Sequence, residues 1–554
     1  MDAASPTVTG LLLAQAGSSR PGLLFEDRRW SWREHVGACA RYAAALRARR
    51  MAGRPFHVGV LADNGPEFSF LLGGCAFAGA VLVALNPVRR GAALAADVAR
   101  TDCQLVLAEP GYAALLPALD VPVMAFDELE LPAWAPVDPV PAAAEDLLML
   151  IFTSGTSGEP KAVRVTHAKI AVPGVMLAGR FGLGTEDTVY VSMPMFHSNA
   201  VMAGWAVGLA AGAAIALRRR FSASAFLDDI RAFGATYANY VGKPLSYVLA
   251  TPERAGDADN PLRIAYGNEG APADLEKFSE RFGCHVIDGF GSTEGGVAVS
   301  RSPGAPPGAL GQLSDGVAVL DPQTGRPCPP AVFSPGGELL NPAEAVGELV
   351  NTAGPGLFAG YYDDASADAD RMRGGRYWSG DLAYADADGF CWFAGRAGAW
   401  LRVDGENLGT APIERVLLRH PAIAAAAVYG VPDPGELSRD TGGRPPGGAG
   451  PGDQVMACVM LREGAALTPA ELGAFLAGQG DLGRKQRPRF VRVAREMPRT
   501  ATFKVITRLL AAERWHAGGD PVWWRPDGRG PEFAVLEPEQ AAALDAGLVS
   551  GRPG

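Results

Sequence analysis

Short apolar segments alternate with alanine-rich segments of helical length through the first two thirds of the chain. Strands buried on both faces read as nearly continuous apolar runs, and parallel strands require crossover connections that are usually helical. This alternation predicts an α/β fold with mainly parallel sheets. The expected strands are 56–61, 103–108, 147–152 and 188–191, and the expected helices are 32–47, 91–99 and 223–233.

The pattern of predicted strands and helices changes after about residue 395. A chain of 554 residues is too long for one ordinary hydrophobic core, so two or more domains are expected. The C-terminal part predicts a compact α+β module with helices over 411–419 and 469–477 and strands over 424–431, 454–461 and 490–493. We therefore expect a large N-terminal domain over residues 1–395, a small C-terminal domain over 396–515 and a tail over 516–554.

Composition and charge exclude several classes of protein. Hydrophobic residues make up 48% of the chain and charged residues 20%, so general disorder is excluded. The formal net charge of −10 leaves no basic surplus for a nucleic-acid partner. The seven cysteines are scattered and form no C-x-x-C pair, which argues against a disulfide framework or a zinc module. Without the basic start of a signal peptide, the sequence predicts a cytoplasmic protein.

Two uncharged stretches, residues 68–88 and 200–217, have lengths that invite comparison with membrane spans. Both are rich in Gly and Ala rather than Leu and Ile, so their predicted insertion energy is weak. We expect each to be a buried helix that runs into a buried strand. Peripheral membrane contact remains open.

A loop rich in hydroxyls and glycines follows the expected strand 147–152. Its glycines allow backbone N–H groups to converge, its hydroxyls donate hydrogen bonds, and its lysine adds charge, so the loop suits an anion. It is not a Walker A loop, because that motif needs a different glycine spacing and a Ser or Thr after the lysine. A flexible loop without a ligand is the alternative. The candidate phosphate-binding residues are Thr153, Ser154, Gly155, Thr156, Ser157, Gly158 and Lys161.

A second glycine-rich loop spans residues 289–296, with the sequence GFGSTEGG. Glu294 stands where a dinucleotide-binding G-x-G-x-x-G motif needs its last glycine, so that reading fails. Phe290 is instead suited to stack on a base, Thr293 to bond a phosphate, and Glu294 to bind Mg²⁺ through oxygen. Taken alone, the loop is equally compatible with a turn that exposes a glutamate.

Two further motifs lie toward the C-terminus. Asp381 is suited to accept hydrogen bonds from ribose hydroxyls, and Arg396 is a fixed cation for ribose or phosphate. The segment 404–407 contains Gly405. Lys504 ends the run PRTATFK, although a single lysine is usually a solvated surface residue.

Together, in this order and spacing, these motifs resemble those of the ANL superfamily, which comprises acyl-CoA synthetases, luciferases and nonribosomal adenylation domains. The resemblance covers residues from about 20 to 515. The segments GNEG (267–270), RVDGEN (402–407) and TFK (502–504) are most similar to actinobacterial fatty-acyl-CoA ligases of the fatty-acid-transport-protein branch.

The resemblance implies the ANL fold: a multi-subdomain N-terminal domain with mainly parallel sheets, and a small, mobile α+β C-terminal domain. It also implies ATP, Mg²⁺ and coenzyme A as cofactors and substrates, and a small-molecule carboxylate that is adenylated and then transferred to a thiol. The loop 153–161 would hold the β- and γ-phosphates, Thr293 a phosphate and Glu294 the Mg²⁺. Adenine would lie between Gly270, Ala271, Pro272 and Phe290, and the ribose against Asp381 and Arg396.

By the same resemblance, Lys504 would bridge the attacking carboxylate and the α-phosphate. His197 matches an aromatic residue that gates the acyl site, with a structural histidine in a turn as the alternative, and His167 is equally compatible with a structural role. In this family the C-terminal domain rotates between the two half-reactions, and the hinge of that rotation aligns with Gly398. Gly405 would then approach the thiol channel. Ala399 departs from the usual aspartate, and residues 331–345 and 435–452 are additional to the usual pattern.

The leading hypothesis is an acyl-CoA ligase for a medium- or long-chain fatty acid. One alternative is a related enzyme that activates an aryl acid for a carrier thiol, or nitrite for diazotisation of an aromatic amine. Another is a non-catalytic nucleotide- or lipid-binding protein, against which the intact motif residues argue. The sequence is compatible with a homodimer but does not define the oligomeric state.

Overall fold

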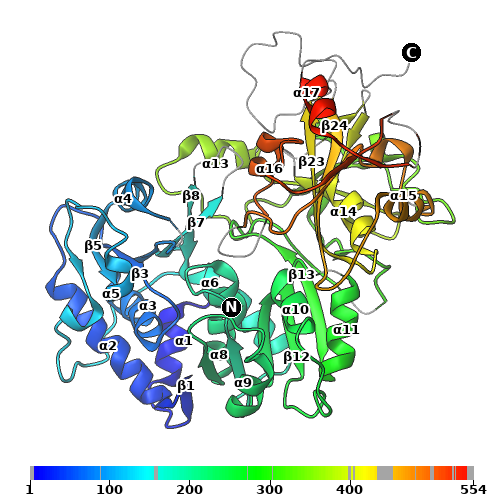
Figure 1. Cartoon of the computed structure of the whole chain (residues 1–554). Helices are drawn as coiled ribbons and strands as arrows, with labels where there is room; N and C mark the ends of the chain where they lie inside the picture. The colour runs from blue at the N-terminus through cyan, green and yellow to red at the C-terminus, as the bar shows by residue number, and fades with distance from the viewer. Residues whose placement is uncertain are drawn as a thin grey trace. The chain divides into compact units, whose positions relative to one another are not determined.

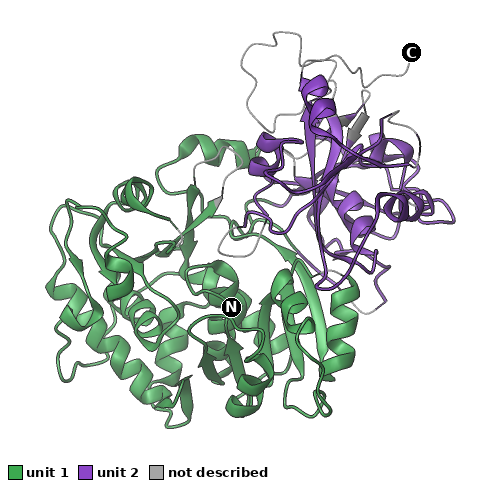
Figure 2. Cartoon of the chain, viewed as in Figure 1, with its two compact units in different colours: residues 1–298, 354–377 green, residues 299–353, 378–554 purple. Residues whose placement is uncertain are grey.

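The computed structural model describes residues 5–87, 89–154, 160–270, 272–301, 304–396, 401–403, 406–432, 453–480, 482–499, 505–526, 530 and 532–545 (Figure 1). Contacts between Cα atoms divide the chain into two compact units (Figure 2). Unit 1 comprises Met1–Ala298 and Gly354–Tyr377, and unit 2 comprises Val299–Ala353 and Trp378–Gly554. These units do not coincide with the predicted domains, because residues 299–353 and 378–395 group with the C-terminal residues. The mobile boundary near residue 395 stays a prediction.

Unit 1 contains a sheet that carries three of the predicted strands. Its order is β6-β5-β3-β4-β7-β8, and its pairs are parallel except for β7 and β8. Every described residue of β3 and β5 is buried, as the continuous apolar runs predict. The strands are β3 (His57–Leu61), β4 (Val81–Ala84), β5 (Cys103–Ala108), β6 (Val123–Met124), β7 (Leu147–Ser154) and β8 (Pro160–Thr166).

A second sheet follows the order β14-β13-β12-β11-β9-β10-β1-β2, with parallel pairing from β1 through β13. One of its faces packs against α9, α10 and α11 through a core that includes Phe226, Ile230, Leu245 and Phe278. The strands are β1 (Pro21–Phe25), β2 (Arg28–Ser31), β9 (Thr188–Val191), β10 (Ala214–Leu217), β11 (Tyr237–Val241), β12 (Ile264–Asn268), β13 (His285–Gly291) and β14 (Ala298–Ser300).

The helices of unit 1 follow the predicted windows closely. A capping box at Ser31 and Glu34 begins α2 at Trp32, where the expected helix begins. The helix expected from residue 223 begins instead at Phe226, because the Ser222 hydroxyl accepts the Ala225 N–H in a preceding turn. The helices are α1 (Val8–Gln15), α2 (Trp32–Ala48), α3 (Pro66–Ala78), α4 (Gly91–Arg100), α5 (Pro110–Ala113), α6 (His167–Arg180), α7 (Ser198–Ala200), η2 (Val201–Trp205), α8 (Ala206–Ala211), α9 (Phe226–Phe233), α10 (Gly242–Leu249), α11 (Pro272–Phe282) and α13 (Ala365–Arg371).

Both uncharged stretches form a helix followed by a strand, as expected. The first is α3 followed by β4, and the second is the π-helix η2 with α8, followed by β10. Among the described residues, we find no helix with the length and apolar character needed to cross a membrane.

Unit 2 contains antiparallel strands and the predicted C-terminal module. One sheet has the order β15-β20-β19-β17-β16, with β18 beside the start of β19, and β21 and β22 form a separate pair. These strands are β15 (Gly311–Gln312), β16 (Val317–Leu320), β17 (Gly347–Asn351), β19 (Arg376–Ala385), β20 (Phe390–Arg396), β21 (Leu401–Val403) and β22 (Glu406–Leu408). The strand β18 (Met372–Arg373) and the first two residues of β19 belong to unit 1. The additional residues 331–345 include a bridge between Phe333 and Leu339 and the helix α12 (Pro342–Ala345).

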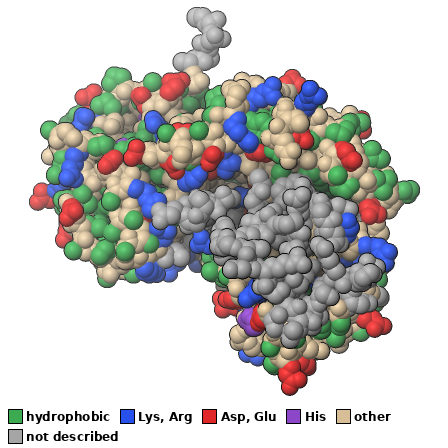
Figure 3. All heavy atoms as spheres, turned by 90° about the horizontal axis from the view of Figure 1, so that it is seen from above, with side chains coloured by type: hydrophobic (Ala, Val, Ile, Leu, Met, Phe, Trp, Pro, Cys, Tyr) green, Lys and Arg blue, Asp and Glu red, His purple; other side chains and the backbone are tan. Residues whose placement is uncertain are grey.

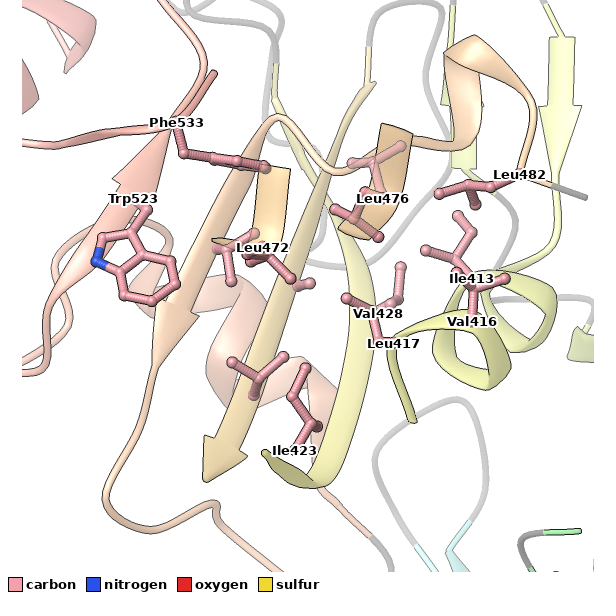
Figure 4. Close-up of a cluster of buried hydrophobic side chains, with 14 of the residues drawn as sticks. Ile413, Val416, Leu417, Ile423, Val428, Leu472, Leu476, Leu482, Trp523 and Phe533 are labelled. Atoms are coloured by element: carbon pink, nitrogen blue, oxygen red, sulfur yellow. The ribbon is translucent and has the colours of Figure 1, made fainter. Parts of the chain in front are cut away.

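The C-terminal sheet has the order β23-β24-β25-β26-β27. Side chains of α14 and α15, including Ile413, Leu417 and Leu472, pack against it (Figure 4). Trp523, in the segment expected to be a tail, belongs to this core, because residues 522–524 are apolar enough to form a buried strand. The elements are β23 (Ile423–Pro432), β24 (Asp453–Leu461), β25 (Phe490–Val493), β26 (Val522–Trp524), β27 (Ala534–Val535), α14 (Thr410–Leu418), α15 (Pro469–Ala477), η4 (Arg484–Gln486), α16 (Thr507–Glu513) and α17 (Pro538–Asp545).

Charged side chains of both signs occur on the face drawn in Figure 3. The basic run at 218–220 is engaged by acidic partners: Arg218 pairs with Asp229 at 2.8 Å, and Arg220 with Asp63 at 2.9 Å. This basic run therefore forms ion pairs with acidic residues of unit 1.

Candidate active site

The predicted phosphate loop connects two antiparallel strands. In the register of β7 and β8, Thr153 lies opposite Lys161 and Ser154 opposite Pro160. Gly155, Thr156, Ser157 and Gly158 lie outside the described residues, as does the side chain of Ser154. The hairpin therefore brings the first and last residues of the motif side by side, with the loop between them.

Glu294 lies beside this hairpin. The Thr153 hydroxyl donates to Glu294 Oε1 at 3.4 Å, and the Tyr361 hydroxyl donates to the same oxygen at 3.1 Å. Burial alone would raise the pKa of Glu294, but a backbone hydrogen bond and the cations Arg371 and Lys169 hold this pKa below its usual value. The side chain is therefore a carboxylate at neutral pH.

An ionised carboxylate with a neighbouring hydroxyl fits Mg²⁺, which proteins bind through one or two carboxylates together with substrate phosphates. We find no cluster of three or more His, Cys, Asp or Glu side chains arranged for a metal in the described parts of the chain. The donor set at Glu294 and Thr153 thus suits a metal that arrives with a nucleotide rather than one held in an all-protein cage.

Lys169 is a buried basic residue that interacts electrostatically with Glu294. Its side chain is 0% exposed and its Nζ donates to the Arg164 carbonyl at 3.2 Å. Burial lowers the pKa of Lys169 to about 7, against the opposing effect of the Glu294 charge. A Cβ added at Gly295 would lie 3.2 Å from Lys169 Cε, so glycine after Glu294 leaves room for this lysine.

Tyr361 and Arg371 complete the surroundings of Glu294. Arg371 Nε donates to the Tyr361 hydroxyl at 3.3 Å, and Lys161 Nζ lies 5.2 Å from the centre of the Tyr361 ring. Sequence reasoning missed Lys169, Tyr361 and Arg371. A lysine three residues into a helix and a tyrosine in a loop carry no local signal, and their roles depend on contacts with Glu294 that are distant in sequence.

The segment that contains His197 contacts the same region. Ser198 Oγ and Thr293 Oγ1 lie 2.8 Å apart in a hydrogen bond. His197 precedes α7, and its ring lies 4.6 Å from the ring of Phe196. Its role at the acyl site stays a prediction. His167 is buried at the start of α6, where burial lowers its pKa to about 4.

Three asparagines link α7 to the ends of β11 and β12. Asn199 Nδ2 donates to the Tyr240 carbonyl at 3.0 Å and to Asn268 Oδ1 at 3.2 Å, and Asn239 Nδ2 donates to Asn199 Oδ1 at 2.6 Å. Because a carbonyl can only accept, the Tyr240 bond defines which way the Asn199 amide points. The network holds the turn after His197 against the sheet.

Three of the residues predicted to surround adenine, Gly270, Pro272 and Phe290, lie at or just beyond the carboxyl ends of β12 and β13, which is where open parallel sheets bind ligands. The Gly270 N–H donates to Asp288 Oδ1 at 3.1 Å, and Pro272 begins α11. Phe290 lies near the end of β13. Ala271 lies outside the described residues.

Unit 2 brings the predicted ribose-binding pair together. Asp381 on β19 lies opposite Arg396 on β20, and Arg396 Nε is 3.3 Å from Asp381 Oδ1. Asp381 is 6% exposed, whereas the Arg396 side chain is half exposed. Gly405, Lys504, Gly398 and Ala399 lie outside the described residues, as do residues 435–452.

Fold and site together have the features of an adenylate-forming enzyme: a hydroxyl- and glycine-rich hairpin, an adjacent carboxylate and the carboxyl ends of parallel strands. Residues 13–362 match the family described as AMP-binding enzyme, and the chain belongs to this family.

Among its curated relatives, the chain is 54% identical to the medium/long-chain-fatty-acid–CoA ligase FadD17 of Mycobacterium marinum, over 94% of this chain and 98% of the relative. It is 43% identical to the steroid-22-oyl-CoA synthetase of Rhodococcus jostii, over 98% of both chains. It is 29% identical to the mouse long-chain fatty acid transport protein 3, over 88% of this chain and 76% of the relative.

Solved structures support the fold. The anthranilate CoA ligase AuaEII in complex with anthranoyl-AMP matches with a TM-score of 0.76 at 20% identity, over 92% of this chain and 97% of that chain. ATP-bound MatB from Rhodopseudomonas palustris matches with a TM-score of 0.76 at 21% identity, over 91% and 98%. At these identities the likeness concerns the fold, which is the predicted ANL fold.

Proposed function

We propose that this protein is an ATP- and Mg²⁺-dependent ligase that adenylates a medium- or long-chain fatty carboxylate and transfers the acyl group to coenzyme A. The observation that carries the proposal is the 54% identity to a medium/long-chain-fatty-acid–CoA ligase over nearly the full length of both chains. The hydrogen-bonded group of Thr153, Glu294 and Tyr361 supports it, because this group places a carboxylate beside the predicted phosphate loop.

In the proposed reaction, a carboxylate oxygen of the acid bonds to the α-phosphorus of ATP and pyrophosphate leaves. The thiol of coenzyme A then bonds to the acyl carbon, loses its proton, and AMP leaves with the C–O bonding pair. Such chemistry requires positioning and charge neutralisation more than covalent participation by the protein. Mg²⁺, held by Glu294, would neutralise phosphate charge.

The other side chains would bind and orient the substrates. Lys161 and the loop residues would hold the β- and γ-phosphates, and Thr293 a further phosphate oxygen. Asp381 with Arg396 would hold the ribose, and Gly270, Ala271, Pro272 and Phe290 would surround the adenine. His197 would border the acyl site. A mobile C-terminal part from about residue 396 would deliver Lys504 for adenylation and then the loop around Gly405 to the thiol channel.

The test is a screen for pyrophosphate release over fatty acids of graded chain length, aryl acids and nitrite, each with and without coenzyme A. We expect release with medium- or long-chain fatty acids, and acyl-CoA only when coenzyme A is present. Release of AMP with nitrite or with an aryl acid, but with no fatty acid, would contradict the proposal.

A steroid carboxylic acid is the second candidate substrate. The specific observation is the 43% identity to a steroid-22-oyl-CoA synthetase over 98% of both chains. Adding a C22 steroid acid to the same screen separates the candidates through the ratio of kcat/KM values. A steroid acid that exceeds every fatty acid by tenfold or more would select the second candidate.

Lys504 provides a test of the two half-reactions. Lys504→Ala should reduce adenylation by about 10²–10³-fold, because a positioned charge at the developing anion is lost. Thioester formation from supplied acyl-AMP and coenzyme A should stay within a few fold of the unchanged protein. Equal loss of both half-reactions would contradict the role assigned to Lys504.

We also propose that the enzyme works in the cytoplasm, that any contact it makes with membranes is peripheral, and that it does not bind nucleic acid. Sedimentation with phosphatidylglycerol vesicles tests the membrane contact. Light scattering coupled to size-exclusion chromatography distinguishes a homodimer from a monomer.

A further inference from the structure

Tyr361 is fixed beside the strand that carries Lys161, although the two residues are far apart in sequence. The Arg164 N–H donates to the Gly360 carbonyl at 3.0 Å, and the Tyr362 N–H donates to the Ala162 carbonyl at 2.8 Å. Tyr361 also forms an antiparallel bridge with Val163. The backbone around Tyr361 thus acts as a short strand along the free edge of β8.

The side chain of Tyr361 contacts both groups that the motifs assign to the nucleotide. Its hydroxyl donates to Glu294 Oε1 at 3.1 Å and accepts from Arg371 Nε at 3.3 Å, so its one proton is given to the carboxylate. Its ring lies under Lys161 Nζ at 5.2 Å, within the range of a cation–π interaction. The side chain is only 3% exposed, which limits these contacts to one arrangement.

We propose that Tyr361 is a positioning residue for the metal and phosphate sites: it orients Glu294 toward Mg²⁺, keeps the Arg371 guanidinium off that carboxylate, and holds Lys161 over its ring. The inference rests on the proposed function of Glu294 and Lys161. Both hydroxyls that reach Glu294 bond the same oxygen, Oε1.

The physical reason is competition for a carboxylate. A guanidinium pairs readily with a carboxylate through two parallel hydrogen bonds, and such a pair would occupy the oxygens that Mg²⁺ needs. The Tyr361 hydroxyl gives Arg371 a different acceptor and itself donates a neutral hydrogen bond to the carboxylate. Loss of the hydroxyl would remove this acceptor from Arg371.

The test compares two single-atom deletions on adjacent tyrosines. Tyr361→Phe removes the hydroxyl on Glu294 but keeps the ring under Lys161. Tyr362→Phe is the matched control, because its hydroxyl donates to Asp102 Oδ2 at 2.8 Å. Calorimetry with α,β-methylene-ATP, with and without Mg²⁺, measures nucleotide binding without turnover, and thermal melting checks the fold.

We expect Tyr361→Phe to weaken the Mg²⁺-dependent part of nucleotide binding by about 10–100-fold, the usual cost of losing a partner of a metal ligand. Binding without Mg²⁺ and the melting temperature should change little, and Tyr362→Phe should match the unchanged protein. Equal loss with and without Mg²⁺, or no loss beyond that of Tyr362→Phe, would overturn the proposal.

A second variant tests the competition itself. Arg371→Gln in the Tyr361→Phe background should restore part of the Mg²⁺-dependent affinity, because the competing cation is gone. No recovery in a variant with an unchanged melting temperature would overturn the role given to Arg371. Because the readout is analogue binding, a failure of the fatty-acid screen would refute the proposed substrate while leaving this measurement interpretable.

Discussion

At the scale of single residues, the site depends on keeping one partly buried carboxylate charged. Glu294 lies among two cations, Lys169 and Arg371, and two hydroxyl donors, Thr153 and Tyr361. Burial of a lone carboxylate would favour its protonated form, which cannot bind a metal strongly. These cations and hydrogen-bond donors therefore keep Glu294 ionised in the free protein, as a bound metal cation would do in the complex.

His35 provides a prediction for stability against pH. It is fully buried, its Nε2 lies 3.0 Å from Ser69 Oγ, and burial lowers its pKa to about 3. Because the folded pKa lies below the unfolded value near 6.5, the stabilisation is present above pH 6.5 and is lost as the pH falls toward 3. Between pH 7 and pH 5, the unchanged protein should lose about 2 kcal/mol more unfolding free energy than His35→Gln.

Urea unfolding at the two pH values measures this difference. His285→Gln, at an exposed position, is the control and should keep the slope of the unchanged protein. Equal pH dependence in His35→Gln and the unchanged protein would contradict the prediction.

At the scale of elements, close approach of backbones determines where glycine is needed. Gly242 begins α10 directly after β11, and an added Cβ there would lie 1.7 Å from the Glu269 carbonyl oxygen. Glu269 itself has a φ of +65°, so the close contact joins two backbone segments that are both conformationally constrained. Glu269 directly precedes Gly270, so this contact supports the backbone of the predicted adenine site.

Gly242→Ala should therefore cost about 1–3 kcal/mol of unfolding free energy and weaken ATP binding, because the backbone must move. Gly37→Ala is the matched control: this glycine is inside α2, and an added Cβ meets nothing within 4 Å. It should stabilise the protein by about 0.5–1 kcal/mol. Chemical unfolding and ATP titration measure both effects, and a neutral Gly242→Ala would contradict the packing argument.

Much of this element structure could be predicted from the sequence. The runs 103–108, 188–191 and 490–493 are strands with the expected bounds. Short, continuous apolar runs of this length are typical of strands that are buried on both faces of a sheet. The motif residues Thr153, Lys161, Thr293 and Glu294 could also be selected, because hydroxyls, glycines and charges in one loop are unusual. Lys169, Tyr361 and Arg371 could not, because they come near Glu294 only through the fold, from segments that are distant in sequence.

At the scale of the whole molecule, the chain passes between the two units more than once: residues 354–377 belong to unit 1, but the segments on either side of them belong to unit 2. Sequence periodicity could not predict that residues 354–377 return to unit 1, because periodicity reports only local structure. The same return places Tyr361 on the edge of β8.

The two units have separate hydrophobic cores, so we expect two transitions in differential scanning calorimetry. Gly37→Ala, in unit 1, should raise one transition and leave the other unchanged. A single transition with equal calorimetric and van't Hoff enthalpies would contradict independent unfolding of the units.

The pairing of residues 360–362 with β8 has a consequence for synthesis. The ribosome makes β8 long before it makes the segment that covers the strand's outer edge, and in the interval that edge exposes unpaired N–H and C=O groups. A nascent chain that stalls before Gly354 would carry an open strand edge that invites pairing with other chains. We therefore expect a chain that ends before Gly354 to aggregate more readily than the full chain, because its β8 edge stays uncovered.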